Sequence, residues 1–462
     1  MLTIELLHES KEPFYEQIYK HIRDEIKIGN LTKHTKLPSS RRLATHLDIS
    51  RNTVDTAYAQ LIAEGYIVSI PKSGYYVCEL ETPIRQERLE DDWREEKKQD
   101  KQYIVDFSPN GVDMENFPYN QWRKLTKEVM SSDNSDLFQL GDPQGDLEFR
   151  QTIRQYLHQS RGVHCQENQI IIGAGMDYLL LLLGMLLGNR KKIAFEEAVY
   201  PQAYHVFESL GFFMQMISLD EQGMEVSQLE QTDCDIAYVT PSHQYPTGVV
   251  MSISRRLKLL AWANAEDGRY IIEDDYDSEF RYQGRPIPAL QGNDQKGKVI
   301  YLGTFSKGIA PAIRISYMVL PQRLYKKFKE TYSFYSSTVS RIDQAVMNRF
   351  MKNGYFERHL NRMRGIYKAK HDRLLRELRQ LEDRITIIGE SAGLHLLIVY
   401  HGDQTEATLL KLAEEQGIKL YPLSSYTKNN KMMEKPVFIL GFARLSEEEI
   451  KKGISILKQI WS

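Results

Sequence analysis

Five short apolar runs between residues 170 and 302 constrain the fold of this chain more than any other feature. The runs are rich in β-branched residues and alternate with helical segments, which is the pattern of a mostly parallel sheet covered by helices. Such a sheet binds ligands beyond the carboxyl ends of its strands. We therefore expect an α/β domain whose strands include Ile170–Ile172, Lys191–Phe195, Ile236–Val239, Tyr270–Ile272 and Val299–Leu302.

The residues after the fifth run carry the most specific chemistry. Gly303 ends the predicted strand, and Thr304, Ser306 and Lys307 follow it, with Arg314 a short distance beyond. A lysine amine at the end of a strand can form a Schiff base with an aldehyde cofactor, and hydroxyls with an arginine can donate to a phosphate monoester. Taken alone, such a stretch is more often a surface loop. The residues at the other strand ends therefore decide between a loop and a cofactor site.

The other strand ends supply complementary groups. A Gly-rich turn over residues 173–176 would leave backbone N–H groups at a helix N-terminus, which attracts phosphate. Tyr200 could stack on a flat heteroaromatic ring, although a lone aromatic residue is more often part of a core. The adjacent carboxylates Asp274 and Asp275 are poorly explained by packing. Together with the amine, these groups are what pyridoxal 5'-phosphate (PLP) requires, because its pyridine nitrogen stays protonated only beside a negative partner.

The order of these motifs resembles the fold-type I class I aminotransferases over residues 105–462. The resemblance implies that Lys307 forms the Schiff base with PLP, that Asp274 pairs with the pyridine nitrogen and that Tyr276 hydrogen-bonds to the ring oxygen O3'. Asp274 is preferred to Asp275 because of its spacing to the tyrosine, but the sequence does not separate the two. By the same resemblance, Tyr200 stacks on the ring. The phosphate would be held by Ala174, Gly175, Met176, Thr304, Ser306 and Arg314.

Several departures from the aminotransferase pattern fall in the site. The asparagine that usually precedes Pro-Thr-Gly is Tyr245, so Gln244 or His243 has to contact the cofactor instead. Ile439 stands where the family usually has an arginine that binds a substrate carboxylate. The remaining departures keep a hydroxyl or replace glycines near the phosphate end, at Thr304, Ala312 and Ser316.

The first 80 residues have a separate pattern. Apolar residues recur at helical spacing from Pro13 to Ile28, a capped helix follows Ser39, and a third helix begins after Ser50 and ends at Gly65. Alternating residues around a glycine turn over 66–78 predict a β-hairpin. Two helices joined by a tight turn and followed by a hairpin form a winged helix-turn-helix, whose second helix enters the DNA major groove by its N-terminal end.

Charge within this module is local. Ten Lys and Arg residues balance ten Asp and Glu residues over 1–80, but between Lys33 and Thr53 five basic residues face only Asp48, as expected of a surface that meets phosphates. A winged helix used only for protein contacts is the alternative. The patterns Leu-Pro-Ser-x-Arg-x-Leu-Ala and Ser-Arg-x-Thr-Val resemble the GntR-type winged helix, which often has a basic residue where this chain has Asp55. The resemblance implies DNA contacts from Arg41, Ser50, Arg51, Asn52 and Thr53 and, in the wing, from Lys72, Ser73 and Gly74.

Composition excludes several other classes of protein. With a net charge of -2 over 462 residues, the chain is not a globally basic nucleic-acid binder. Cys78, Cys165 and Cys234 form no CxxC pair, so we expect no metal site and no disulfide, which suits a reducing cytoplasm. The N-terminal residues lack the basic segment of a signal peptide. The apolar run Tyr178–Leu187 is about half of the ~20 residues that span a bilayer, so we expect no membrane segment.

A GntR-type winged helix followed by an aminotransferase-like domain is the arrangement of the MocR regulators, which the sequence resembles over nearly its whole length. Ser-His-Gln-Tyr-Pro-Thr-Gly (242–248) and Glu-Asp-Asp-Tyr-Asp-Ser-Glu-Phe-Arg-Tyr (273–282) carry that resemblance. It implies a multidomain protein with an α+β winged helix-turn-helix domain over 1–80, a charged linker over 81–102 and an α/β fold-type I PLP-dependent aminotransferase-like domain over 103–462.

The same resemblance implies a PLP-dependent transcriptional regulator that binds operator DNA and forms a head-to-tail homodimer. Its aminotransferase-like domain would sense a small molecule and have at most weak aminotransferase activity. A working aminotransferase with a vestigial DNA module is the alternative, and a PLP-storage protein is a third. MocR relatives that clamp a carboxylate use arginines at the positions of Gln202 and Ile439. We therefore expect the effector to be PLP itself or an amine whose acidic group is recognised elsewhere.

Overall fold

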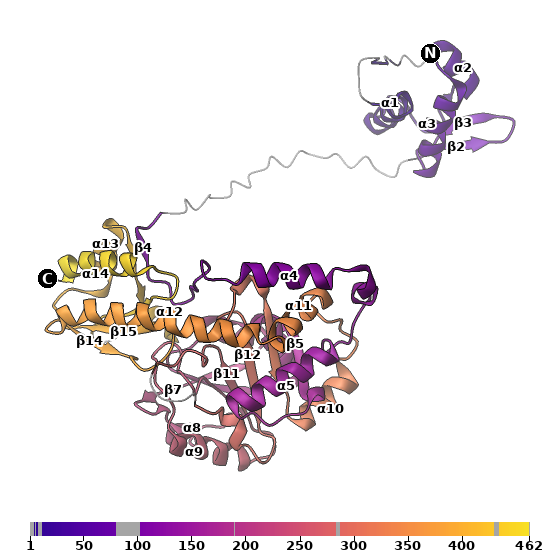
Figure 1. Cartoon of the computed structure of the whole chain (residues 1–462). Helices are drawn as coiled ribbons and strands as arrows, with labels where there is room; N and C mark the ends of the chain where they lie inside the picture. The colour runs from indigo at the N-terminus through magenta and orange to yellow at the C-terminus, as the bar shows by residue number, and fades with distance from the viewer. Residues whose placement is uncertain are drawn as a thin grey trace. The chain divides into compact units, whose positions relative to one another are not determined.

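The computed structural model describes residues 4, 6–7, 12–79, 102–188, 190–282, 287–428 and 434–461. The chain forms two compact units, Met1–Asp100 and Lys101–Ser462 (Figure 1). The linker that we predicted over 81–102 lies, apart from Gln102, outside the described residues. Its boundaries therefore stay a prediction.

The N-terminal unit packs three helices against a small antiparallel sheet. The helices are α1 (Phe14–Ile28), α2 (Ser40–Leu47) and α3 (Arg51–Ala63), and the sheet has the order β1-β3-β2, with β1 (Lys36–Leu37), β3 (Gly74–Val77) and β2 (Ile67–Ile70). Ile18, Ile22 and Ile26 recur every fourth residue and are buried, so one face of α1 supplies much of the core. The predicted helices and hairpin are confirmed.

The C-terminal unit is built around a seven-stranded sheet of order β5-β13-β12-β11-β10-β6-β7. All neighbours are parallel except β13, which runs antiparallel to both β12 and β5. The predicted strands are confirmed as β5, β6, β10, β11 and β12, whereas β7 and β13 were not predicted. The bounds are β5 (Ile170–Ala174), β6 (Lys192–Glu196), β7 (Phe213–Ile217), β10 (Ile236–Val239), β11 (Tyr270–Asp275), β12 (Val299–Thr304) and β13 (Ile315–Val319).

Helices cover both faces of this sheet, because successive side chains of a buried strand point to opposite faces. Ile170 and Ile172 pack with the cluster under α4 (Tyr119–Val129), α5 (Leu147–Arg161), α11 (Arg341–Lys352) and the long α12 (Tyr355–Leu378). Ile171 instead packs with α6, α7 and α10 on the other face. The bounds of these three are α6 (Met176–Leu187), α7 (Pro201–Ser209) and α10 (Gln322–Thr331).

A second, antiparallel sheet of order β14-β15-β18-β17 lies in the C-terminal part of the same unit. Its strands are β14 (Ile385–Ile388), β15 (His395–Tyr400), β18 (Val437–Gly441) and β17 (Tyr421–Pro422). The helix α13 (Glu406–Glu415) comes between β15 and β17, α14 (Glu447–Trp461) follows β18, and both lie in the same region (Figure 1). The remaining helices and strands are β4 (Val105–Asp106), β8 (Leu219–Asp220), β9 (Gly223–Met224), α8 (Val226–Leu229), α9 (Ile253–Asn264) and β16 (Ile418–Lys419).

Candidate functional site

A cavity of about 290 Å³ opens beyond the carboxyl ends of β5, β10, β11 and β12, where the sheet topology places ligands. A more open cleft beside α5, about 780 Å³ in volume, contains none of the predicted cofactor residues. The smaller cavity brings most of them together. Its lining comprises Asn110, Met176, Asp177, Tyr200, Thr240, Tyr245, Asp274, Tyr276, Thr304, Ser306, Lys307, Pro311 and Arg314.

Lys307 presents its amine to the cavity from the turn that follows β12. The Nζ atom donates a hydrogen bond to the carbonyl oxygen of Pro109 at 3.1 Å. Burial lowers the pKa of Lys307 to about 8, and the negative charge of Asp277 opposes that shift. A larger fraction of this amine is therefore neutral and nucleophilic near neutral pH than for an exposed lysine.

Asp274 faces the cavity with one oxygen that lacks a partner. Its Oδ2 accepts a hydrogen bond from the hydroxyl of Tyr238, and its buried Oδ1 accepts none from any residue that the structure describes. Burial raises the pKa of Asp274 to about 7, Tyr238 opposes the shift, and Asp275 adds to it. A cation placed in the cavity would satisfy this oxygen and restore the charged form, so the site fits a protonated pyridine nitrogen.

Asp275 lies on the opposite face of β11 and stabilises the fold through buried hydrogen bonds. Its Oδ2 accepts from the Nε atom of Arg161 at 2.7 Å and from the hydroxyl of Tyr301 at 2.5 Å. Only about 4% of the Arg161 side chain and 2% of that of Asp275 are exposed. The two carboxylates that the sequence could not separate thus have different neighbours, and only Asp274 lines the cavity.

Donors for an anion gather at one end of the cavity, at the N-terminus of α6. The guanidinium of Arg314 contacts Asp177 Oδ2 at 2.8 Å and lies so close to Gly175 that a Cβ atom there would be 2.3 Å from it. The Thr304 hydroxyl oxygen accepts from the Ser316 hydroxyl at 2.9 Å. A guanidinium, hydroxyls and a helix N-terminus together suit a phosphate monoester.

Ala174, Gly175 and Gln244 are predicted cofactor residues that do not line the cavity. Ala174 and Gly175 form the turn behind the Arg314 guanidinium. The amide of Gln244 donates to Glu196, to the carbonyl of Ala198 and to the carbonyl of Tyr245 at 2.8–3.1 Å. Gln244 therefore braces its own loop, contrary to our expectation that it contacts the cofactor, and Tyr245 lines the cavity in its place.

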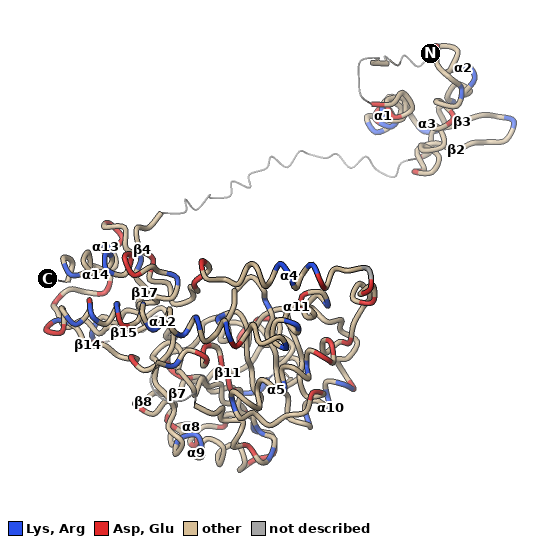
Figure 2. The backbone as a smooth tube through the Cα atoms, in the orientation of Figure 1, with Lys and Arg blue, Asp and Glu red and all other residues tan. Residues whose placement is uncertain are grey.

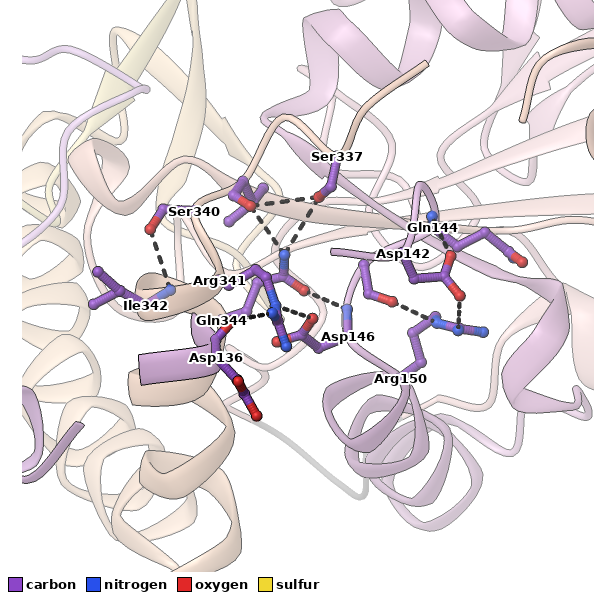
Figure 3. A network of polar contacts seen from close by, with 12 residues as sticks. Asp136, Asp142, Gln144, Asp146, Arg150, Ser337, Ser340, Arg341, Ile342 and Gln344 are labelled. Atoms are coloured by element: carbon purple, nitrogen blue, oxygen red, sulfur yellow. Dashed lines mark hydrogen bonds and ion pairs between the residues drawn. The ribbon is translucent and has the colours of Figure 1, made fainter. Parts of the chain in front are cut away.

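A polar network behind the anion end was not anticipated from the sequence (Figure 3). Gln344 accepts from the backbone N–H of Asp146 at 2.8 Å, and Arg341 donates to the Asp146 carboxylate at 2.9 Å. The network ties α11 to the segment before α5. Nearby, Thr338 accepts from the backbone N–H of Ala174 at 3.0 Å. These contacts join residues almost 200 positions apart in sequence, as with Asp146 and Gln344, so no local pattern could reveal them.

The predicted DNA-contact residues divide into helix caps and exposed side chains. Ser50 accepts from the backbone N–H of Thr53 at 3.2 Å and shares a hydrogen bond with its hydroxyl, so both residues hold the start of α3. Arg51 and Asn52 are exposed at that helix N-terminus, and Arg51 Nε lies 3.3 Å from the carboxylate of Asp55.

Arg41 is exposed on α2, and the turn between β2 and β3 carries Lys72 and Gly74 at φ angles of 60° and 118°. Ser73 in that turn shares a hydrogen bond with Tyr76. Figure 2 shows Lys and Arg residues on α2 and at this turn. All predicted contact residues thus belong to the second helix, the start of the third helix or the wing, which are the parts of a winged helix that meet DNA.

Two family models match the chain. The model "Bacterial regulatory proteins, gntR family" matches residues 14–77, and the model "Aminotransferase class I and II" matches residues 103–457. The HTH-type transcriptional regulator YdeL of Bacillus subtilis (strain 168) is 40% identical over 97% of this chain and 97% of its own length. The probable rhizopine catabolism regulatory protein MocR of Rhizobium meliloti is 32% identical over 96% and 93%. This chain belongs to the MocR family of transcriptional regulators.

This MocR regulator is also similar to another regulator over most of its length and to aminotransferases over its C-terminal unit. The HTH-type pyridoxine biosynthesis transcriptional regulator PdxR of Corynebacterium glutamicum is 30% identical over 89% of this chain and 88% of its own. A crystal structure of an archaeal alanine:glyoxylate aminotransferase superposes with a TM-score of 0.70 at 26% identity, over 79% of this chain and 92% of its own. The chain is thus a GntR-type helix-turn-helix regulator fused to a fold-type I aminotransferase-like domain, and that fold implies PLP as the ligand class of its pocket.

No helix among the described residues is long and apolar enough to cross a membrane. Within the same part of the chain, no group of three or more His, Cys, Asp or Glu side chains is arranged to hold a metal ion. Cys78, Cys165 and Cys234 are free thiols.

Proposed function

We propose that this MocR regulator holds PLP at Lys307 and changes its affinity for operator DNA in response to PLP. The observation that carries the proposal is that Asp274, whose Oδ1 has no partner among the described residues, lines the same 290 Å³ cavity as Lys307 and Arg314. A buried carboxylate oxygen without a partner is costly in a protein that binds nothing there. A ligand with an aldehyde for Lys307, a protonated ring nitrogen for Asp274 and a phosphate for Arg314 would give each of these groups a partner.

The predicted cofactor residues have separate tasks in this proposal. Lys307 supplies the amine that anchors the ligand, and Asp274 keeps the ring nitrogen protonated. Tyr200 lies against the ring, and Tyr276 directs its hydroxyl to it. The phosphate is held by Arg314, Thr304, Ser306 and the backbone of Met176, with Ala174 and Gly175 shaping the turn. When bound, PLP supplies an electrophilic aldehyde and an electron-withdrawing ring.

The operator would be bound by the winged helix. Arg51 and Asn52 project from the N-terminus of α3, the end that enters a major groove, while Ser50 and Thr53 fix its first turn. Arg41 would contact phosphates from α2, and the turn of Lys72, Ser73 and Gly74 would contact the backbone or a minor groove. A regulator of this kind works where chromosomal DNA lies, in the cytoplasm.

We further propose that the regulator acts as a homodimer. Three large apolar side chains of the C-terminal unit, Phe138, Leu140 and Phe334, are 64%, 89% and 73% exposed, and a second copy would cover them. A second copy would also join two winged-helix domains. Once one of them is bound, the second binds at a high effective concentration, which raises the affinity for an operator with two half-sites.

The effector in this proposal is PLP itself, or an amine whose acidic group is recognised elsewhere. Ile439 is fully buried among apolar neighbours of β18, and Gln202 is exposed on α7. Arg444, the nearest other arginine, donates to Asp106 at 3.0 Å and does not line the pocket. Without a guanidinium fork, a carboxylate here would lose charge-assisted bonds of about 1.5–3 kcal/mol.

Binding of the full-length protein to its own upstream DNA, with and without PLP, tests the proposal. We expect a visible absorption band on addition of PLP and a change in DNA affinity at the same PLP concentration. No PLP uptake would refute the proposal. Steady turnover of an amino donor with a keto acid, without an effect of PLP on DNA affinity, would instead favour an enzyme, and PLP uptake with neither effect would favour storage.

A further inference from the structure

A buried pair, His243 and Asp277, lies directly behind the pocket, and the proposed function gives it no task. His243 comes after β10 and Asp277 after β11, and about 2% of each side chain is exposed. Nδ1 of His243 lies 3.0 Å from Oδ2 of Asp277 and 2.8 Å from the hydroxyl of Tyr276. One imidazole nitrogen therefore contacts both a carboxylate and the phenol that lines the pocket.

Asp277 determines which atom carries the hydrogen in this group. An ionised carboxylate only accepts hydrogen bonds, so the Nδ1 atom that faces Asp277 carries the hydrogen. A nitrogen that carries a hydrogen cannot accept one, so at this contact the oxygen of Tyr276 accepts. The hydrogen of the Tyr276 hydroxyl then has two directions: toward Asp277, whose charge and hydrogen bond help to raise the pKa of Tyr276, or into the cavity that Tyr276 lines. Because the N–H of His243 already occupies Asp277, an acceptor oxygen placed in the cavity takes this hydrogen.

The surroundings of His243 favour the same arrangement. Its Nε2 is buried and has no hydrogen-bond partner among the described residues, so a hydrogen on that atom would have no acceptor. A Cβ atom on Gly393 would lie 1.9 Å from the imidazole ring, and one on Gly248 would lie 3.3 Å from Nε2, so two glycines hold the ring in place.

The ring of His395 lies next to the His243 ring, with their centroids 5.2 Å apart. Burial lowers the pKa of His395 to about 3, and His243 and Lys307 add to that shift. His395 is therefore uncharged near neutral pH. Asp277, Tyr276 and His395 are thus the titratable groups in contact with His243, and Lys307 acts on its neighbour His395.

We propose that His243 and Asp277 are positioning residues that fix Tyr276 as a hydrogen-bond donor toward the cofactor held at Lys307. The proposal rests on the proposed function, in which PLP occupies this pocket. Neither His243 nor Asp277 lines the cavity, so both act through Tyr276. Donation from Tyr276 stabilises negative charge on the ring oxygen of the cofactor. That charge would be greatest once the nitrogen that joins the cofactor to Lys307 has lost its proton, and loss of this proton changes the visible band. Donation from Tyr276 would therefore lower the pH at which the band changes.

The pH midpoint of the visible band of the PLP-loaded full-length protein tests the proposal. Tyr276→Phe is expected to raise the midpoint by about one pH unit, the order set by one charge-assisted hydrogen bond. Asp277→Asn should shift it in the same direction but by less, although the Tyr276 hydroxyl is intact. An amide no longer forces the hydrogen onto Nδ1, while the loss of the Asp277 charge, which raises the pKa of Lys307, opposes the shift. His243→Leu should shift it too. His243→Asn should stay near the wild type, because its amide N–H can donate from about the position of Nδ1.

The proposal is overturned if Tyr276→Phe shifts the midpoint but Asp277→Asn and His243→Leu do not, even where they lower thermal stability. If the wild-type protein takes up no PLP, the proposed function fails by itself. The pair is then tested without cofactor by nitrogen-15 NMR of histidine-labelled protein, with His243→Asn used to assign the signal. A hydrogen on Nδ1 of His243 supports the proposal, and a hydrogen on Nε2 overturns it.

Discussion

The pocket and the DNA-contact surface differ in how their polar groups are satisfied before any partner binds. In the pocket, Asp274 has a buried oxygen without a described partner, and burial lowers the pKa of Lys307. On the winged helix, Arg41 and Asn52 are exposed to water, and Arg51 is exposed beside the carboxylate of Asp55. A ligand in the pocket therefore supplies hydrogen-bond partners that buried groups lack, whereas DNA displaces water from side chains that are already solvated. We expect large, salt-insensitive effects of mutation in the first region and small, salt-dependent effects in the second.

The largest effect is expected for Lys307→Ala. This variant removes the amine that anchors PLP, so the visible band should disappear completely after dialysis. The fold should persist, because the amine makes a single hydrogen bond to the described residues, to the carbonyl of Pro109. Absorption spectra before and after dialysis measure the loss. The control is Lys296→Ala, an exposed lysine between β11 and β12. A band that survives in Lys307→Ala would assign the cofactor to another lysine.

The neighbouring carboxylates of β11 should respond in opposite ways. Asp274→Asn removes the partner of the ring nitrogen, so PLP affinity should fall more than tenfold while thermal stability is kept. Asp275→Asn leaves the buried Arg161 without its charged partner, which costs about 3–5 kcal/mol of stability. PLP titration and chemical denaturation measure both variants. If both variants lose only stability, the roles assigned to the two faces of β11 are wrong.

The pocket should also make stability depend on pH when PLP is absent. Because the pKa of Asp274 is raised to about 7, the folded state keeps this proton up to about neutral pH, while the unfolded chain loses it near its ordinary pKa of 3.8. The folded state binds more protons in that window, so this contribution to stability is lost as pH rises through it. Glu196, Glu273 and Glu279, whose pKa values are also raised to about 7, act in the same direction.

Asp274→Asn isolates the share of one carboxyl in this pH dependence. The denaturation midpoint of the wild type should fall more steeply than that of the variant between about pH 4 and about pH 7, the two pKa values of Asp274. Addition of PLP should flatten the wild-type curve, because a protonated ring nitrogen then pairs with the carboxylate. Equal slopes for both proteins would show that Asp274 is ionised throughout this range.

The strands and most of the pocket could be predicted because they rest on local patterns. β5, β6, β10, β11 and β12 are apolar runs that end in unusual polar residues, and those ends meet at one edge of the sheet. The edge strand β7 alternates exposed and half-buried residues before the buried Ile217, and no residue that suggests ligand chemistry follows it, so it was missed. The sequence shows that Asp274 and Asp275 point to opposite faces, but not which face carries the cavity.

Contacts between distant segments account for what could not be predicted. Arg161 decides the role of Asp275 from 114 residues away, and Ser316, known from the sequence only as a replaced glycine, donates to Thr304 from the antiparallel β13. Gln244 looked like a cofactor ligand because of its place in the motif. Its partner Glu196 lies 48 residues earlier in the chain, where no spacing rule applies.

On the DNA surface, Arg51→Ala is expected to have the larger effect. Arg51 is exposed at the N-terminus of α3 and is held by Asp55, so it is oriented for a base edge, where a bidentate contact is worth about 1–3 kcal/mol. The variant should therefore lose affinity for the operator and lose discrimination at one base pair. Titrations with operator variants measure both. Asp55→Ala frees the same guanidinium and should relax discrimination while keeping affinity. Unchanged discrimination in both variants would show that α3 docks differently.

The smallest effect is expected for Lys72→Ala in the wing. Lys72 lies at a turn with φ of 60°, beside Gly74, where a hairpin can reach the phosphate backbone but offers no fixed partner that would orient a base contact. Neutralising one phosphate contact should weaken binding about equally for operator and unrelated DNA. It should also reduce the slope of log affinity against log salt concentration by about one. Arg51→Ala shares the loss of charge but adds a loss of discrimination, so a comparison of both variants at two salt concentrations separates base contact from phosphate contact. If Lys72→Ala alters the preference among operator variants, Lys72 contacts base edges in a groove. The DNA-contact surface would then make sequence-specific contacts both at the N-terminus of α3 and in the wing.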